Sequence, residues 1–324
     1  MAAVPRWVTS ILAAAALMAL GAGPATARPL AAAGVERAAV ITPRAAIAAT
    51  PRAAAPCRGV RAPKRYAHVI WIWFENHGIN QVIGSKQAPY FNGVARSCAL
   101  ATQYSAISHP SLPNYIAATS GGTQGIHGDG PPSKNAKRAV SIYELAKSWK
   151  AYAESMPGPC HLKDGGKGYA VRHDPSAYYL RLRPVLCRRD VPLGSPSSGA
   201  LASDLRHNHL PKFSFITPNT CNDMHSCPVG TGDGWLRRWL PALLRSRAYR
   251  RGTTAIFLTF DESEGGGGNR VATIAIAPSV RRHVQTAAPF SHYSLLRTTE
   301  SMLGLRPLLG AAAHARSMRA ALHL

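Results

Sequence analysis

From about residue 64 to the C-terminus, short continuous apolar runs alternate with helix-like segments. The apolar runs predict β-strands at 67–74, 213–216, 254–260 and 271–277. The helix-like segments predict helices at 142–149 and 235–244, with two more that begin near Ser291 and Ala311. The first strand and the last two are apolar throughout, as expected for strands that are covered on both faces. The pattern therefore predicts an α/β layered domain.

Two stretches between these elements, 119–139 and 156–199, are dominated by glycine, proline and basic residues. This composition predicts long loops. In compact domains, long loops are often the segments that choose the substrate. We therefore expect substrate selectivity to reside in these two stretches.

The N-terminal segment has the pattern of a secretory signal peptide. Arg6 precedes an apolar run at 7–20, and Ala25-Thr26-Ala27 has the small residues of a cleavage site, so we expect cleavage near Ala27. A retained membrane anchor is the alternative, but this run is shorter than the ~20 residues needed to cross a bilayer, and no later segment is long and apolar enough. The sequence thus predicts a secreted, extracellular protein without a transmembrane segment.

The rest of the chain divides into two further parts. Residues 28–63 are rich in Ala, Arg and Pro, a composition that buries little surface and predicts a flexible linker. Residues 64–324 are long enough for one sizeable core, and they contain neither a second linker nor an internal repeat. We therefore expect signal peptide 1–27, linker 28–63 and one catalytic domain at 64–324.

The chain contains six cysteines, and an even number in a secreted protein predicts disulfides. They are Cys57, Cys98, Cys160, Cys187, Cys221 and Cys227. Six cysteines allow fifteen pairings, among which the sequence does not choose. Cys160 with Cys187 and Cys221 with Cys227 would close local loops, and Cys57 with Cys98 would tie down the amino end. A zinc cluster is the alternative, but the sequence has no Cys-x2-Cys pair.

The chain is strongly basic, with 38 Lys and Arg against 15 Asp and Glu and a net charge of +23. Such a charge attracts anions, including phosphates, nucleic acids, acidic lipids and wall polymers. The basic residues are scattered, however, without interleaved aromatic residues or a recognisable nucleic-acid module. We therefore expect no specific nucleic-acid partner and a monomeric protein; a solvated basic surface explains the charge equally well.

Acidic and amide side chains follow two of the predicted strands. Glu75 and Asn76 come directly after the first strand, and Asp261 and Glu262 come after the strand at 254–260. Since ligands gather at the carboxyl ends of strands in open α/β sheets, these four residues predict one shared metal site. Oxygen ligands admit Mg, Ca or Mn, and a site completed by histidine could take Zn. The alternatives are a helix-capping pair at the first strand and a solvated acidic turn at the second.

A serine and three histidines could supply the remaining chemistry. Ser111 lies between two prolines that fix the local backbone, and a nearby cation would lower the pKa of its hydroxyl and activate it as a nucleophile. A proline-rich turn capped by Ser111 is the alternative. His173, His225 and His292 each stand beside polar residues and could bind phosphate or protonate a leaving alkoxide, although a histidine in such a position, taken alone, is more often structural or a helix cap.

Several motifs in one order point to a known family. In chain order they are Phe74-Glu75-Asn76-His77, Ala88-Pro89-Tyr90, His109-Pro110-Ser111-Leu112-Pro113-Asn114-Tyr115, Phe215 to Asn219 with Asp223-Met224-His225, Thr259 to Glu262, and His292 to Leu296. With them the chain resembles the secreted phosphoesterases that include bacterial phospholipases C and acid phosphatases. The resemblance covers nearly all of residues 65–315. It implies an alkaline phosphatase-like layered fold, with a central, mostly parallel sheet flanked by helices, and phosphoryl transfer through a phosphorylated serine or threonine.

The resemblance also implies a role for each site residue. Ser111 would be the catalytic nucleophile, and Glu75, Asn76, Asp261 and Glu262 would bind one divalent metal ion. His173, His225 and His292 would contact the phosphate or the leaving group, and Asn114 would bind phosphate. Larger family members carry an extra C-terminal region and a longer segment before the nucleophile loop, so activity on lipids is a weaker expectation than activity on soluble esters.

The sequence therefore predicts a secreted, metal-dependent phosphoesterase of the acid phosphatase or phospholipase C type. Its substrate would be a phosphate monoester or phosphodiester, including a phospholipid head group. A serine acyl hydrolase is one alternative, but the chain has no Gly-x-Ser-x-Gly motif. A non-catalytic basic protein that binds wall polymers or nucleic acid is another, and it would explain the charge but not the motifs.

Overall fold

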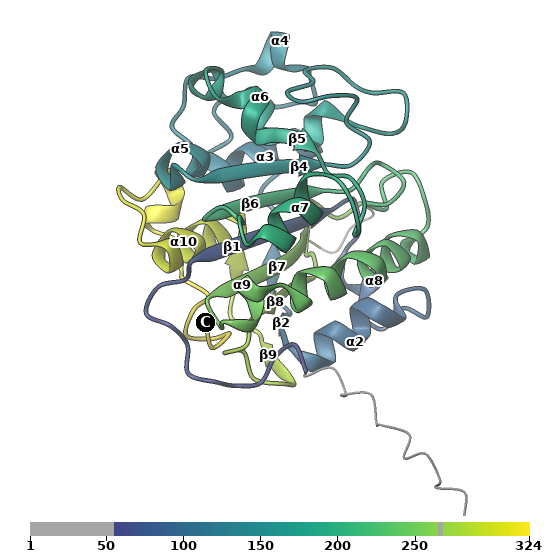
Figure 1. The fold of residues 1–324 in the computed structure, drawn as a ribbon, viewed down its shortest axis with the longest axis vertical. Coiled ribbons are helices and arrows are strands. Elements are labelled where there is room, and N and C mark those ends of the chain that lie inside the picture. Colours follow the sequence, from purple (N-terminus) through teal and green to yellow (C-terminus); the bar gives the residue numbers. More distant parts are fainter. Residues whose placement is uncertain (1–54, 265–267) are drawn as a thin grey trace, which may run out of the picture. The chain divides into compact units, whose positions relative to one another are not determined.

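The central sheet of the protein has eight strands in the order β5-β4-β6-β1-β7-β8-β2-β9 (Figure 1). The computed structural model describes residues 55–264 and 268–324, so the predicted signal peptide and most of the linker lie outside it. The strands are β1 (His68–Phe74), β2 (Ala99–Ala101), β4 (Trp149–Ala153), β5 (Asp190–Pro192), β6 (Phe213–Thr217), β7 (Thr254–Phe260), β8 (Thr273–Ile276) and β9 (Val284–Thr286). β8 is antiparallel to β7 and β2, and all other pairs are parallel, which confirms the predicted mostly parallel sheet. β3 (Tyr104–Ser105) and β10 (Phe290–Ser291) form a separate parallel pair.

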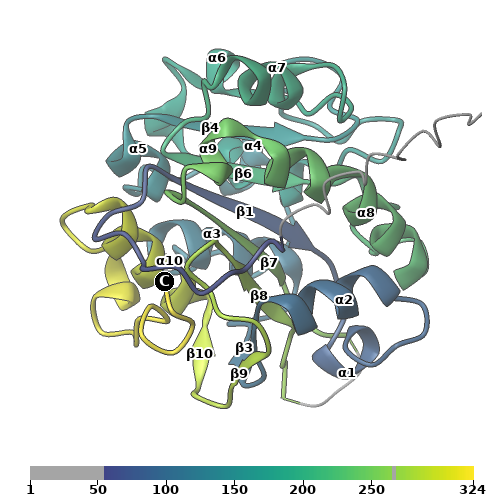
Figure 2. The same ribbon diagram turned by 60° about the horizontal axis from the view of Figure 1, so that its bottom comes forward.

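Helices cover both faces of this sheet (Figures 1 and 2). One face carries α3 (Ser111–Ser120), α5 (Ile142–Ala146) and α10 (His292–Leu303), which contact one another. The other carries α2 (Pro89–Ser97), α7 (Ala200–His207), α8 (Val229–Arg245) and α9 (Arg247–Arg250). The shorter elements are α1 (Ile79–Val82), α4 (Pro132–Asn135), α6 (Leu186–Arg189) and 3-10 turns at Val171–His173, Pro175–Tyr178, Leu180–Leu182 and Gly310–Ala313. The arrangement confirms the predicted α/β layered fold.

Strand β1 lies between β6 and β7 and is buried on both faces. Successive side chains of a strand point to opposite faces. Trp73 accordingly packs on Tyr115 of α3, whereas Phe74 packs on Phe91 of α2 and Trp235 of α8. Each fully buried large side chain contributes about 1.5–3 kcal/mol relative to exposure. Burial on both faces explains why the strand reads as a continuous apolar run.

Helix α3 begins at Ser111, where the sequence indicated a proline-rich turn. Pro113 lies in its first turn, where the missing backbone N–H would have no intrahelical partner in any case. The helix ends at Gly121, whose φ of 78° lies in the left-handed region that favours glycine. All ten residues of α3 are buried, so the helix holds Ser111 in a fixed position.

Most predicted elements are present, with shifted ends. The strand predictions at 67–74, 213–216 and 254–260 agree with β1, β6 and β7 to within one residue, and 271–277 shortens to β8. The predicted helix at 235–244 lies within α8, and the one near Ser291 is α10. Two predictions were wrong in part. The helix at 142–149 stops at Ala146 and is followed by β4, and the segment near Ala311 forms only a 3-10 turn.

The structure pairs all six cysteines, as Cys57–Cys98, Cys160–Cys187 and Cys221–Cys227. The predicted presence of disulfides is therefore confirmed, and the pairs are the two that close local loops and the one that ties down the amino end. Cys57 is buried, and the amides of Arg58 and Val60 donate to the carbonyl of Pro278, so the folded unit begins before residue 64. The two stretches predicted as loops contain short elements, including α4, α6 and β5.

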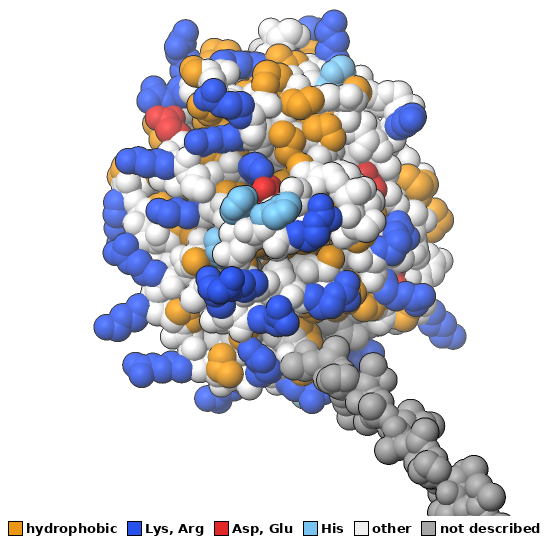
Figure 3. Space-filling model, in the orientation of Figure 1, with side chains coloured by type: hydrophobic (Ala, Val, Ile, Leu, Met, Phe, Trp, Pro, Cys, Tyr) orange, Lys and Arg blue, Asp and Glu red, His pale blue; other side chains and the backbone are white. Residues whose placement is uncertain are grey.

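The surface carries the excess of basic residues in a dispersed form. Figure 3 shows Lys and Arg side chains spread over the visible face, with few acidic side chains between them. In the part of the chain that the structure covers, no helix is both long and apolar enough to span a bilayer.

Candidate active site

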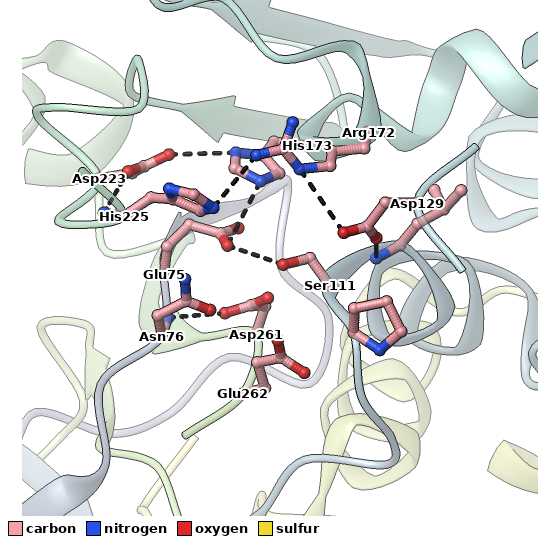
Figure 4. Close-up of polar contacts among 12 residues, drawn as sticks. Glu75, Asn76, Ser111, Asp129, Arg172, His173, Asp223, His225, Asp261 and Glu262 are labelled. Carbon is pink, nitrogen blue, oxygen red and sulfur yellow. Dashed lines mark hydrogen bonds and ion pairs between the residues drawn. The ribbon is translucent and has the colours of Figure 1, made fainter. Parts of the chain in front are cut away.

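The register of the sheet brings the two predicted acidic motifs together. β1 and β7 are parallel neighbours, with Phe74 opposite Phe260, so the next residues leave the same edge of the sheet side by side. The backbone amide of Asn76 donates to Asp261 Oδ1 at 3.0 Å (Figure 4). Asn76 has a φ of 62°, a left-handed conformation that asparagine tolerates better than most residues. The predicted convergence of Glu75, Asn76 and Asp261 is thus present in the structure.

Ser111 faces these acids from the first residue of α3. Its Oγ donates to Glu75 Oε2 at 3.0 Å, and the residue is 3% exposed. The N-terminus of a helix favours negative charge, so this position suits a seryl oxygen that becomes anionic. Tyr115, one turn further along α3, donates a short hydrogen bond to Glu75 Oε1. Glu75 is therefore held by two residues of one helix.

Glu262, the fourth predicted metal ligand, lies beside Asp261 and has partners of its own. His109 Nδ1 is 2.7 Å from Glu262 Oε2, which links the loop before Ser111 to the end of β7. Asn114 also approaches this oxygen, with its Nδ2 at 3.5 Å. His109 and Glu262 together fix the backbone on which Ser111 sits.

Asn114 occupies a different position from the one predicted. Its Oδ1 accepts the amides of Ile107 and Ser108, both at 2.9 Å, and its Nδ2 donates to the carbonyls of Ser108 and Pro110. The residue is fully buried. Because its side-chain groups are committed to the nucleophile loop, the structure does not support the predicted contact with phosphate. Asn114 instead positions the loop.

His173 and Asp223 form a buried pair aimed at Glu75. His173 Nδ1 is 3.1 Å from Asp223 Oδ2, and its Nε2 is 3.3 Å from Glu75 Oε2. The backbone amide of His225 donates to Asp223 Oδ1 at 2.8 Å. Asp223 and His225 lie on the segment closed by the Cys221–Cys227 disulfide. A carboxylate on Nδ1 fixes the ring orientation and leaves Nε2 toward the site.

His292 lies behind the site. Its Nε2 is 2.7 Å from the carbonyl oxygen of Asp261, and its Nδ1 is 3.0 Å from the hydroxyl of Tyr104. The ring is fully buried and packs on Trp73. With both nitrogens engaged by protein, His292 is placed to position Asp261, and the structure does not support the predicted contact with phosphate.

Three charged residues at the site were not among the predicted ones: Asp223, Arg172 and Asp129. Arg172 Nη2 is 3.1 Å from His225 Nε2, and its Nε is 3.7 Å from Asp129 Oδ2 (Figure 4). Asp129 Oδ1 in turn accepts the amide of Leu112, the residue after Ser111. In the sequence, the only signal for Arg172 was its position beside His173, and the only signal for Asp129 was an acidic residue in a glycine-rich stretch. Both are partly exposed, unlike the acids below them.

The carboxyl groups of the site have strongly altered proton affinities. Burial raises the pKa of Asp261 and of Asp223 to about 7, and burial with the nearby Asp261 raises the pKa of Glu262 to about 8. Burial, with Asp261 and Asp223 close by, raises the pKa of Glu75 well above its usual value. Burial also lowers the pKa of His173 well below its usual value. These directions mean that the acids need a positive partner in order to ionise.

The donor groups fit a divalent cation. Asn76 Oδ1 and Asp261 Oδ2 are buried oxygens without a hydrogen-bond partner, close to the Ser111–Glu75 contact. Unpartnered buried oxygens of this kind are the hard ligands that Mg²⁺, Ca²⁺ and Mn²⁺ prefer. Within residues 55–264 and 268–324, one group of His, Asp and Glu also brings its ligand atoms within 4.8 Å of one another: Glu75, His173 and Asp223. The two sets share Glu75, and the second adds a nitrogen ligand that zinc accepts.

Known proteins resemble the chain over most of its length. A model described as the phosphoesterase family matches residues 71–306. A phosphatidylinositol-3-phosphatase of Mycobacterium tuberculosis is 30% identical over 257 residues, which cover 77% of this chain and 81% of that protein. A phosphate-repressible acid phosphatase of Penicillium chrysogenum is 29% identical over 74% of this chain. The chain spans only 59% of the length of this fungal relative.

Solved structures agree on the fold at much lower identity. A Vibrio parahaemolyticus protein of the alkaline phosphatase superfamily superposes with a TM-score of 0.56 at 12% identity, over 82% of this chain and 71% of that one. A lipoteichoic acid synthase of Listeria monocytogenes gives a TM-score of 0.54 at 10% identity, over 78% and 76%. These likenesses support the alkaline phosphatase-like layered fold and nothing about substrates.

Proposed function

The chain belongs to the phosphoesterase family, and from this premise we propose that it is a secreted, metal-dependent hydrolase of phosphate esters that acts through a phosphoserine intermediate. One observation carries the proposal. The Ser111 hydroxyl donates to a buried carboxylate, Glu75, at the edge of the sheet where Asn76 and Asp261 hold unpartnered oxygens. Three disulfides favour an oxidising, extracellular location.

In the first step Ser111 Oγ forms a bond to phosphorus while the bond from phosphorus to the alcohol oxygen breaks. Ser111 Oγ loses one proton and the departing alcohol oxygen gains one. Glu75 Oε2 accepts the hydrogen bond of Ser111 Oγ, and His173 Nε2 lies 3.3 Å from the same oxygen, so these two residues are on the path of the proton. A divalent cation held by Glu75, Asn76, Asp261 and Glu262 would stabilise negative charge on the seryl and phosphoryl oxygens.

In the second step the oxygen of a water molecule bonds to phosphorus and the serine–phosphate bond breaks; one proton of that water goes to Ser111 Oγ, and for a monoester substrate inorganic phosphate leaves. Arg172 is placed to bind the non-bridging oxygens, since its guanidinium lies beside His225 at the partly exposed side of the site. His225 shares this position. We therefore assign phosphate binding to Arg172 and His225, and positioning roles to Asn114 and His292.

The names of the relatives favour phosphomonoesters as the substrate class, because they are phosphatases of phosphatidylinositol 3-phosphate or acid phosphatases. Phospholipase C activity, on a diester, is the second candidate within the same chemistry. Because the match covers only 55–59% of the length of the fungal relatives, a substrate carried over from them is part of the proposal.

The test is Ser111→Ala in the protein reconstituted with Mg²⁺, Mn²⁺, Ca²⁺ or Zn²⁺ and assayed with p-nitrophenyl phosphate. Turnover should fall by at least about a thousandfold, because the variant lacks the hydroxyl that forms the covalent intermediate. Ser108→Ala, a serine in the same loop whose hydroxyl is exposed, is the control and should stay active. Mass spectrometry of acid-quenched wild-type enzyme should find a phosphoryl group on Ser111. Full activity of Ser111→Ala would refute the assignment.

A chelator separates the proposal from its rivals. Phosphoesterase activity should vanish on dialysis against EDTA and return with metal, whereas acyl hydrolysis by a serine enzyme would not respond. Binding of polyanions by charge alone would respond chiefly to salt.

A further inference from the structure

A cavity of about 740 Å³ lies between the two stretches that the sequence predicted as loops. Its lining residues are Pro131, Pro132, Ser133, Lys134, Ala136, Leu162, Lys163, Leu180 and Arg183. Five of them belong to the first stretch, 119–139, and four to the second, 156–199. The cavity is therefore built only from the segments in which we expected substrate selectivity. Its helix α4 stands at the top of Figure 1.

Both walls of the cavity are connected to the active site through a few residues. Asp129, which holds the amide after Ser111 and pairs with Arg172, precedes Pro131 by two positions. On the other wall, Asp164 follows Lys163 directly and accepts the amide of Val171, the first residue of the turn that carries Arg172. Asp129 and Asp164 thus connect the two walls of the cavity to Ser111 and to Arg172, the residue to which we assign phosphate binding.

The two walls are held together before any ligand binds. Lys137 and Tyr179 form a β-bridge, in which the Lys137 amide donates to Tyr178 and its carbonyl accepts from Leu180. The Tyr178 hydroxyl donates to the carbonyl of Gly130 at 3.1 Å. The Cys160–Cys187 disulfide closes the second wall. A preformed cavity of this kind loses little conformational entropy when it binds a ligand.

The lining combines apolar surface with unpaired positive charge. Prolines and leucines provide the apolar part, and Lys134, Lys163 and Arg183 are the only charged residues of the lining. Among the residues that the structure describes, none of these three lies within ion-pair distance of a carboxylate. Unpaired cations beside a concave apolar surface favour a ligand that is itself apolar in part and negatively charged.

We propose that this cavity binds the alcohol part of the substrate, and that this part carries an apolar portion and a further negative charge beyond the ester phosphate. The inference rests on the proposed phosphoesterase function. It adds a substrate class: amphiphilic phosphate esters with a second anionic group. An aromatic phosphate ester with an acidic substituent and an anionic lipid phosphate both have this chemistry.

The experiment compares two soluble substrates that differ by one remote negative charge, 1-naphthyl phosphate and a sulfonated 1-naphthyl phosphate. The wild-type protein should prefer the sulfonated ester in kcat/KM. The double variant Lys134→Glu, Lys163→Glu should lower that preference by about tenfold or more, because two attractions become repulsions. Lys86→Glu with Arg138→Glu, at exposed positions that do not line the cavity, makes the same change in net charge and should keep the preference.

The outcomes separate the inference from the function on which it rests. A wild-type protein that hydrolyses neither ester refutes the phosphoesterase proposal itself. An active wild type with the same preference in the cavity and control variants overturns the cavity inference alone. Equal thermal unfolding temperatures show that the variants fold. Dihexanoyl phosphatidylglycerophosphate adds a lipid substrate that bears the second charge. A loss of kcat/KM in the cavity variant that is confined to this lipid or to the sulfonated ester supports the inference, and the substrate that shows the loss identifies the source of the ligand.

Discussion

Glu75 accepts hydrogen bonds from Ser111 and Tyr115 and faces His173, although its side chain has no exposure to solvent. An isolated buried carboxylate is very unfavourable, so this arrangement requires either a proton or a cation. The surrounding hydroxyls explain how the acid is held in one orientation. They do not neutralise it.

Arg172 gives a test at the scale of one residue. Arg172→Ala should lower kcat/KM for p-nitrophenyl phosphate by about a hundredfold and weaken inhibition by inorganic phosphate, because a charge-assisted contact to phosphate is lost. Arg172→Lys should recover part of the phosphate affinity, since it keeps the charge but not the planar fork. Inhibition constants for phosphate, measured beside the exposed control Arg138→Ala, check this. Unchanged inhibition in Arg172→Ala would remove the arginine from the phosphate site.

The raised pKa values of the acids predict how the effect of metal depends on pH. Asp261 and Asp223 have pKa values of about 7 in the fold, against about 4 in an unfolded chain. Below about pH 4 both states are protonated, and between about 4 and 7 only the folded state keeps its protons, so the free energy of unfolding of the metal-free protein falls as pH rises through this window. A cation binds the ionised acids and offsets this loss. The increase in Tm on adding metal should therefore be small at pH 5 and larger at pH 8.

Differential scanning calorimetry at both pH values, with EDTA or with saturating metal, checks this prediction. Asp261→Asn should reduce the pH dependence of the increase in Tm on adding metal, because it removes one of the acids that must ionise. An increment that is the same at pH 5 and pH 8 would contradict it.

The sequence identified those site residues whose placement is a local consequence of a strand. Glu75 and Asp261 follow strands that are neighbours in parallel register, so their position at one edge follows from the pattern itself. The contacts of Asn114 and His292 could not be predicted, because they depend on which backbone groups lie nearby in three dimensions. Arg172 lies in an irregular segment whose position is set by tertiary contacts.

Among the secondary-structure elements, the long strands were easier to predict than the short strands of the same sheet. β1 and β7 are seven residues long and predominantly apolar, which gives a clear signal. β2, β5 and β9 have only three residues each, too few to show a period. Trp149, the first residue of β4, was assigned to the preceding helix because the apolar residues of both elements are adjacent in the sequence, and the rest of β4 was not predicted. Pairing with β6 makes residue 149 the start of a strand.

Helix α3 offers a test at the scale of one element, at its C-terminal glycine. Gly121→Ala should destabilise the fold by about 1–3 kcal/mol, because φ is 78° there and a Cβ would lie 2.2 Å from the Leu309 carbonyl oxygen. Gly93→Ala is the matched control, since Gly93 lies inside α2 with no atom within 4 Å of its Cβ position. That change should be neutral or stabilise by up to about 1 kcal/mol. Urea unfolding of both variants checks the difference, and equal midpoints would contradict it.

For the whole molecule, the sequence established the layered α/β fold, since apolar runs that are covered on both faces require helices on each side. It did not establish the strand order, because β2, which is distant in the sequence, lies between β8 and β9 and has no local signal that indicates this position. The net charge of +23 named no partner, and the structure spreads basic residues over the visible surface. The three unpaired cations of the cavity became apparent only when the two loop segments were placed side by side.

The ring closed by Cys221 and Cys227 spans six positions and carries Asp223 and His225. Since this closure depends on oxidation, a chain kept among reduced thiols lacks the covalent restraint on Asp223 and His225. In the proposed phosphoesterase, the placement of these two side chains is therefore linked to the oxidation state of a single bond.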